Sequence, residues 1–471
     1  MKYPIFTPPV VEESSRKFKI KRYMKKSVLF LTALMLSVSA LAEDRVLAAA
    51  RDGEARKDVP AELELSLKDA QEYAIKQNRS LKNASLAVQE AYAQRWQTIA
   101  AMLPQAQGSI GKNLMYDDSL KLKTINFPGM LEPMSMSPWV YGVQTSVGIN
   151  GQGIVGVLLN NIAIEMKKIA LEKSESDLRG SVMSSYVSVL ALQSISALLD
   201  SSLVNIQNLE QITQNAVNAG ATEQTTADQI RVRVNTLKNS INSQKRNIEL
   251  ATNSLKVLLD VPVETTLVLT EKLDDVLSPD RVLTLLGENF DIRNNLTYQT
   301  LAKNTELAKR NVHMAGWAYG PTVSLAYQYN YRDYGGEAGF EMMNSPHTVA
   351  FSISMPLWSS GKRAAGVIEK KIAYEEAKNT LSETTDNLGI QYSQLCFNLT
   401  NAYETYVNEK DNIDVAQRVF ASATNKYKYG ASSNLELTNA SNDLINAQST
   451  YVQAILNLVN AQVELEKFLN N

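Results

Sequence analysis

The chain has 471 residues, of which 47 are basic and 49 are acidic, and 44% of the residues are hydrophobic. This composition is typical of a folded protein, and the net charge of −2 provides no basic surface for nucleic acid. Cys396 is the single cysteine, which excludes an intrachain disulfide, and we expect it to be a small buried side chain on a helix. Since only His313 and His347 could supply imidazoles, we expect no metal centre and no cofactor.

The N-terminus has the order of a secretory signal. Two lysines precede the apolar residues 28–36, and small residues follow up to Ala42. Residues 1–42 are therefore interpreted as an N-terminal extension and signal peptide, with translation starting at Met1 or Met24. Because no later apolar run reaches 18 residues, we expect no transmembrane helix in the mature chain, and any membrane span must consist of strands.

Residues 43–282 form the first of two predicted halves. A helical pattern from Leu67 to Met102 ends before a proline at position 104. Residues 105–149 then change to a period of two, which predicts a hairpin. Long helices are predicted over residues 155–259.

Residues 283–471 repeat this plan. A helix from Tyr298 to Tyr319 ends before a proline at position 321, and residues 322–357 alternate as a second hairpin. Long helices are predicted over residues 364–469. At about 1.5 Å per residue, helices of this size predict a long helical rod or tube rather than a compact domain.

The long helices carry the same heptad pattern in both halves. Gly430 lies 210 positions after Gly220, and each glycine interrupts a helical pattern, as a left-handed residue at a helix end does. The corresponding heptad rows are Leu444, Tyr451, Leu458 and Leu465, with the companion row Ala447, Ala454, Ala461 and Phe468, in the second half, and Val234, Ile241, Ile248 and Leu255, with the companion row Leu237, Gln244, Ala251 and Leu258, in the first half. We interpret the chain as two internal repeats.

The predicted strands are long enough to cross a bilayer at a tilt, although strands of a soluble sandwich have the same alternation. The tyrosines at 327, 329, 331 and 334 suit an interfacial girdle. Four strands per chain cannot close a barrel, because about eight are needed and an open edge in lipid leaves backbone groups unsatisfied. Three copies would supply twelve strands. The loops at 117–137, with its turn at 127–130, and 333–347, with its turn at 334–336, connect the strands.

From about residue 63 to 471, the chain resembles the TolC-like outer membrane efflux proteins. The order of several loose motifs carries this resemblance more than any single motif. These motifs are residues 65–70 (LSLKDA) through 102–104 (MLP), 298–301 (YQTL) through 320–323 (GPTV), 351–358 (FSISMPLW) with Gly361, and 427–430 (YKYG) with the heptads that follow.

The resemblance implies an α+β membrane protein of the cell outer membrane that extends into the periplasm. Its implied form is a homotrimer with a twelve-stranded transmembrane β-barrel, porin-like in its passive conduction, continued by a long α-helical coiled-coil barrel. The implied partners are a periplasmic adaptor protein, an inner-membrane transporter and outer-membrane lipid, in a tripartite efflux or type I secretion system. It implies no enzymatic activity. Two departures are that only the second half has a strand-to-helix proline, Pro356, and that the turn after Gly220 is expected to be about two residues longer than the turn after Gly430.

The resemblance also implies a narrow gate at the helix tip. The family's inward-facing acidic positions correspond to Glu436 and Asn439, and three copies of Glu436 would attract cations. Residues 433–436 alternatively form a capping box in which Glu436 only closes a helix start, and residues 225–228 repeat that pattern with Asp228. Both interpretations of Glu436 and Asp228 remain open.

By the same resemblance, the adaptor contacts are expected at the two turns, through Gly220 and Ala221 in the first half and Gly430 and Ala431 in the second. The chief alternative for the whole chain is a soluble periplasmic coiled-coil scaffold or adaptor protein with small β-domains. Solubility without detergent would favour that alternative.

Overall fold

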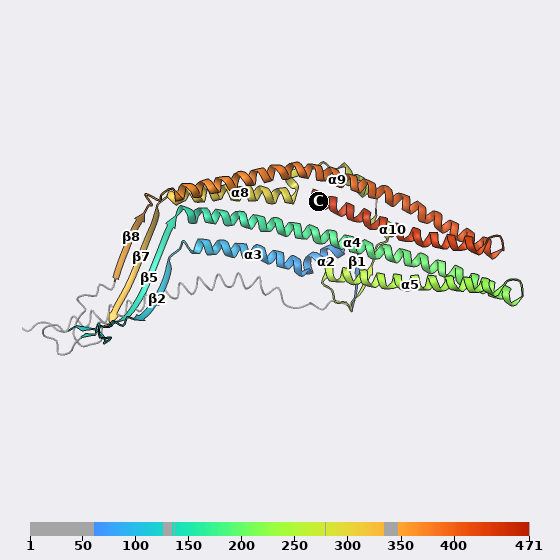
Figure 1. Ribbon diagram of the computed structural model, residues 1–471, viewed down its shortest axis with the longest axis horizontal. Helices are drawn as coiled ribbons and strands as arrows, with labels where there is room; N and C mark the ends of the chain where they lie inside the picture. The colour runs from blue at the N-terminus through green and yellow to red at the C-terminus, as the bar shows by residue number, and fades with distance from the viewer. Residues whose placement is uncertain (1–60, 126–133, 136, 278, 334–346, 471) are drawn as a thin grey trace, which may run out of the picture. The chain divides into compact units, whose positions relative to one another are not determined.

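A computed structural model of the protein describes residues 61–125, 134–135, 137–277, 279–333 and 347–470. The predicted signal peptide and the turn motifs at 127–130 and 334–336 lie outside these residues. The described residues belong to one unit, Pro60–Asn471, whose sheet strands and long helices are shown in Figure 1.

Both predicted hairpins are present and form one antiparallel sheet in the order β2-β5-β7-β8. The strands are β2 (Gln105–Lys112), β5 (Trp139–Asn150), β7 (Thr322–Asp333) and β8 (His347–Ser354). β5 joins the two hairpins by pairing with β7 from Trp139↔Asp333 to Asn150↔Thr322. β8 ends before the expected residue 357, and Pro356, which has no backbone N–H to donate to a ladder, follows it.

The sheet has one apolar and one polar face, as the alternation predicts. Val147, Leu325 and Phe351 are register partners, so they share one face of the sheet. The polar face carries the row Gln107, Gln144, Gln328 and Thr348. On the same polar face, the hydroxyl oxygens of Ser324 and Ser352 lie 2.7 Å apart. The odd-numbered Tyr327 and Tyr331 belong to the apolar face, while residue 334 lies outside the described residues.

The first predicted helix is two helices, α2 (Leu67–Gln77) and α3 (Arg79–Ala100). Asn78 separates them, because its side-chain oxygen accepts hydrogen bonds from the backbone N–H groups of Ser80 and Leu81 and so starts a new helix. The corresponding helix of the second half is α8 (Leu296–Gly316), followed by the 3-10 turn η2 (Trp317–Tyr319).

The long helices are α4 (Gly151–Asn218) and α5 (Gln224–Leu259) in the first half, and α9 (Lys362–Lys428) and α10 (Asn434–Leu469) in the second. α4 has 68 residues and α9 has 67, which corresponds to about 100 Å each. α4 starts four residues before the expected position 155. Its first turn is capped by Asn150, whose side-chain oxygen accepts a hydrogen bond of 2.7 Å from the Gly153 N–H.

Among the described residues, α4 is the one helix whose length and composition would allow it to cross a membrane. One 18-residue window of α4 has a mean hydropathy of 1.6, and 56% of that window is buried. The apolar character has a structural cause within the unit, because α4 packs against α5, α8, α10 and other helices. We therefore interpret α4 as a core helix.

The heptad rows form the helical core. Leu458 and Leu465 of α10 are buried, as are Val234 and Ile241 of α5. Towards the two turns, one cluster joins four helices: Ile195, Leu199, Ile206 and Leu209 from α4, Ile230, Val234, Leu237 and Ile241 from α5, Phe420 and Ala423 from α9, and Leu437, Ala440 and Leu444 from α10. Cys396 lies on α9 as expected, but it is only half-buried.

A second, parallel sheet was missed by the sequence analysis. β1 (Glu62–Leu65) pairs with β6 (Thr266–Leu269), which follows α5. The short helices α6 (Leu273–Val276) and α7 (Pro279–Gly287) and the 3-10 turn η1 (Ile292–Asn294) complete the connection to α8. The proposed boundary between the halves, 282 to 283, falls inside α7.

Candidate functional site

The turn between α4 and α5 has the glycine-ended form that the sequence predicts. Gly220 has a φ of +74°, where a Cβ atom is strained. The Ala221 N–H donates to the Ala216 carbonyl at 2.8 Å, and the Gly220 N–H donates to the Val217 carbonyl at 2.9 Å. These bonds satisfy the last carbonyls of α4 in a Schellman arrangement.

The turn between α9 and α10 has the same bonds. Gly430 has a φ of +71°, and the Ala431 N–H donates to the Lys426 carbonyl at 2.9 Å. In both turns the next helix starts four residues after the glycine, at Gln224 and at Asn434. The expectation of a longer first turn is therefore wrong. The two Schellman turns hold the chain in the same way, although their sequences differ after the glycine.

The helix starts beyond the turns differ. At α10, Ser433 caps the helix by accepting from the Glu436 N–H at 3.1 Å, while the Glu436 carboxylate accepts from the Ser432 hydroxyl at 2.7 Å. At α5, the N-cap is Glu223, and the Asp228 carboxylate accepts from the Gln224 side chain instead of closing a capping box. The predicted box is wrong at Asp228, because α5 starts before Thr225. At Glu436, the bond from its N–H to the Ser433 hydroxyl is the one expected for a capping box, and its carboxylate accepts from Ser432.

Glu436 and Asn439 lie in one groove between α9 and α10. The groove has a volume of about 600 Å³, and Asp443 lies along the same side of α10. From α9, Arg418 and Lys426 line it, and the Lys426 ammonium lies 3.9 Å from the Glu436 carboxylate. The groove thus presents mixed charge. Asp443 was missed, although its position seven residues after Glu436 in a heptad pattern was a signal that could have found it.

The two helical hairpins meet near the turns through Arg233 of α5 and Tyr427 of α9. Burial lowers the pKa of the Arg233 guanidinium and raises the pKa of the Tyr427 hydroxyl, and the charge interaction between the two groups opposes both shifts. Tyr427 also packs against the four-helix cluster. The turn regions of the two halves are therefore fixed to each other within one chain.

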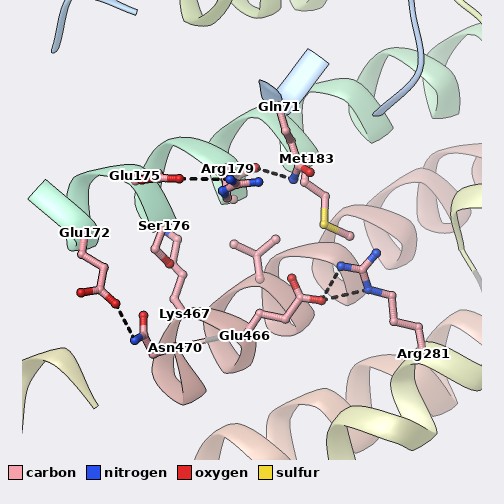
Figure 2. A pocket seen from close by; sticks show the side chains of 12 residues that line it. Gln71, Glu172, Glu175, Ser176, Arg179, Met183, Arg281, Glu466, Lys467 and Asn470 are labelled. Carbon is pink, nitrogen blue, oxygen red and sulfur yellow. Dashed lines mark hydrogen bonds and ion pairs between the residues drawn. The ribbon is translucent and has the colours of Figure 1, made fainter. Parts of the chain in front are cut away.

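A second cleft, of about 320 Å³, lies between the middle of α4 and the end of α10, next to α2 and α7 (Figure 2). Its charged side chains bind one another or neighbouring polar groups. The contacts are Arg281 to Glu466 at 2.9 Å, Arg179 to Glu175 at 3.0 Å, Lys467 to Asp177 at 3.0 Å, and Asn470 to Glu172 at 2.9 Å. Because these groups already have partners, the contacts brace three helices, α4, α7 and α10, and the cleft offers few free charges to a ligand.

The brace also depends on a close helix crossing. A Cβ atom at Gly180 of α4 would lie 2.4 Å from Cγ1 of Val463 and 2.7 Å from the Lys467 Cε. Only glycine permits this approach of α10. Among the described residues, no group of three His, Cys, Asp or Glu side chains is arranged to hold a metal ion.

Comparisons with known proteins agree with this architecture. Residues 292–471 match the outer membrane efflux protein family. The toxin and drug export protein A of Aggregatibacter actinomycetemcomitans is 22% identical over 308 residues, which cover 62% of this chain. The match spans about 63% of the length of that relative.

Solved structures share the fold. A crystal structure of CusC has a TM-score of 0.68 at 17% identity, over 86% of this chain and 91% of that chain. The CmeC outer membrane channel of Campylobacter jejuni has a TM-score of 0.65 at 16% identity, over 86% and 85%. The open MtrE outer membrane channel of Neisseria gonorrhoeae has a TM-score of 0.63 at 16% identity, over 86% and 89%.

The matching family consists of outer membrane efflux proteins, and the CmeC and MtrE structures are outer membrane channels. The family match covers the second half, and the shared fold extends over both. The chain is therefore similar to the outer membrane efflux proteins in the sequence of its second half and to outer membrane channels in its fold.

Proposed function

We propose that the protein is one subunit of a homotrimeric outer-membrane channel that passively conducts exported substrates out of the cell. An inner-membrane transporter and a periplasmic adaptor would deliver the substrates in a tripartite efflux or type I secretion system. The name of the A. actinomycetemcomitans relative suggests toxins or drugs as a substrate class.

The two-faced sheet carries this proposal. Its apolar face, with Phe351 at 66% exposure, has no covering layer among the described residues of the chain, as expected for a face that meets lipid. Its polar face, with the Gln107, Gln144 and Gln328 row, is suited to line water. If both faces were buried in protein, the polar face would lose its contact with water, and an apolar face opposite a polar one would not be expected.

The sheet edges support a trimer. β2 and β8 are the outer strands in the sheet order, so each has a pairing edge available to another copy. Four strands are too few for a closed barrel, and an open edge in lipid is costly. Three chains of four strands would close a barrel of twelve, and the helices of about 100 Å would extend it into the periplasm. The matching order of elements in both halves supports two internal repeats, 43–282 and 283–471.

The helix tips are proposed as the gate. Glu436 and Asn439 share an exposed groove, so we place them at the constriction of the trimer and Asp228 near it. The turn residues Gly220, Ala221, Gly430 and Ala431 are exposed, and they are proposed as adaptor contacts.

Single-channel recording tests the proposal. The chain without residues 1–42, purified in detergent, should form cation-selective channels in a planar bilayer and have the mass of a trimer. Glu436→Ala and Glu436→Gln should both reduce cation selectivity, because a ring of carboxylates is lost. Glu436→Gln retains an acceptor for Ser432, so it separates charge from helix capping. Asp228→Ala should reduce cation selectivity less than the Glu436 variants, because Asp228 is placed near the constriction and not at it.

Two other outcomes are informative. Channels with unchanged selectivity in both Glu436 variants would return this residue to a capping role. A protein that stays soluble without detergent and forms no channels would overturn the channel in favour of a periplasmic scaffold.

A further inference from the structure

The loop that joins β8 to α9, residues 355–361, exposes an unusual amount of apolar surface. Leu357 and Trp358 are each 85% exposed, and Met355 is 55% exposed. Neighbouring large apolar side chains with this exposure indicate a contact surface.

The loop continues the apolar face of the sheet. Val349, Phe351 and Ile353 are exposed on alternate positions of β8, and Met355 and Leu357 extend this spacing of two after the strand ends. In Figure 1, β8 ends next to the start of α9. The apolar row therefore reaches the boundary between the sheet and the long helices.

The loop is held in place by Arg363. Its Nη1 donates to the Pro356 carbonyl at 2.6 Å, its Nε donates to the Ser359 hydroxyl at 2.9 Å, and its guanidinium lies 4.9 Å from the centre of the Tyr319 ring. Gly361 turns the chain into α9 with a φ of +81°. The apolar side chains are thus presented by a braced loop.

The chemistry of the loop favours a phospholipid surface. Tryptophan combines a large apolar ring with one N–H donor and is enriched where a membrane meets water. Lys362 is exposed directly beside the loop, so a cation lies within reach of headgroup phosphates. Apolar side chains such as Leu357 and Trp358 beside a cation such as Lys362 are the combination that binds a membrane–water interface.

We propose that residues 355–358 are an interfacial anchor that inserts Leu357 and Trp358 into the phospholipid layer at the periplasmic end of the sheet. Lys362 contacts headgroup phosphates, and the loop fixes the depth of the sheet in the bilayer. This inference rests on the proposed function, because it requires the apolar face of β8 to contact lipid.

Fluorescence quenching tests the anchor. A protein with Trp358 as its single tryptophan, carrying Trp96→Phe, Trp139→Phe and Trp317→Phe, is reconstituted in vesicles of phosphatidylethanolamine and phosphatidylglycerol with brominated acyl chains. Trp358 emission should be blue-shifted and quenched, more strongly by bromine near the headgroup than by bromine near the chain end. The control places the only tryptophan at the helix tip, as Leu435→Trp with Trp358→Phe, and should not be quenched.

A second measurement avoids dependence on Trp317, which packs closely against Gly151. The difference in quenching between the native chain and Trp358→Phe should show the same depth profile. A blue-shifted but unquenched Trp358 would mean that a second copy of the chain covers the loop, and an unshifted, unquenched one would mean that water does. Either result overturns the anchor.

Conductance of the same preparations separates the two proposals. Channels without bromine quenching refute the anchor and leave the channel standing. If the chain neither conducts nor inserts, both proposals fail.

Discussion

The four-stranded sheet and the helical part of the chain bury their apolar side chains in different places. Leu399, Leu437 and Leu465 of the long helices are fully buried within one chain. On the sheet, Val349, Phe351 and Ile353 are all more than 60% exposed. The helices therefore form a hydrophobic core within one chain, whereas the apolar face of the sheet can be covered only by an apolar environment outside the described part of the chain. This difference explains why one protein combines a water-stable part with a part suited to lipid.

A charge on the apolar face of the sheet should have the largest effect. Phe351→Arg places a guanidinium where the proposal puts lipid, at a cost of about 2–4 kcal/mol near the bilayer centre. Ser352→Arg, the next residue of β8, places the same charge on the polar face and should be tolerated. The measurement is the fraction of protein that stays in vesicles during urea extraction. Equal loss for both variants would contradict the assignment of the two faces.

The helical part should instead respond to high pH through Tyr186. Burial of this side chain raises its pKa to about 12, and its hydroxyl donates to the Leu65 carbonyl of β1 at 3.0 Å. Since the folded state favours the protonated form, this stabilisation is complete below pH 10 and is lost as the pH rises from about 10 to 12. The difference corresponds to about 2–3 kcal/mol.

Thermal unfolding of the native chain and of Tyr186→Phe across this pH range isolates that contribution. The native protein should lose more stability than the variant above pH 10. Parallel pH profiles would show that the Tyr186 hydroxyl is not responsible.

The helix crossing gives a smaller effect. Gly180→Ala forces a methyl group against Val463 and should lower the free energy of unfolding by about 1–3 kcal/mol. Gly389→Ala in α9 meets no atom within 4 Å, so it should stabilise the helix by about 0.5–1 kcal/mol. Circular dichroism at 222 nm follows both variants in one denaturant series. A destabilising Gly389→Ala would point to a neighbour outside the single chain.

Local signals in the sequence predicted the elements but not all their ends. Proline predicted the ends of helices, and a change of period predicted the strands. The break at Asn78 was missed, because an asparagine can either cap a helix or lie inside one. The sequence alone does not distinguish these two positions. The start of α5 was misplaced, because the pattern at 225–228 competes with Glu223, and only the folded turn selects between them.

The candidate site was predictable in part. The left-handed Gly220 and Gly430 followed from the breaks in the heptads, and Glu436 and Asn439 do share a groove. The position of Lys426 beside Glu436 could not be predicted, because it depends on how α9 packs against α10. The roles of these residues in a gate and at an adaptor stay predictions.

The sequence by itself determined the long helices, the two-faced strands and the two glycine turns, because each follows from periodicity or backbone restriction within a short stretch. Only the tertiary structure decided the pairing of β1 with β6, whose residues lie about 200 positions apart and whose strands have four residues each. It also decided the crossing at Gly180 and the exposure of Trp358. Such contacts form between residues that are far apart in the sequence, so a local pattern cannot predict them.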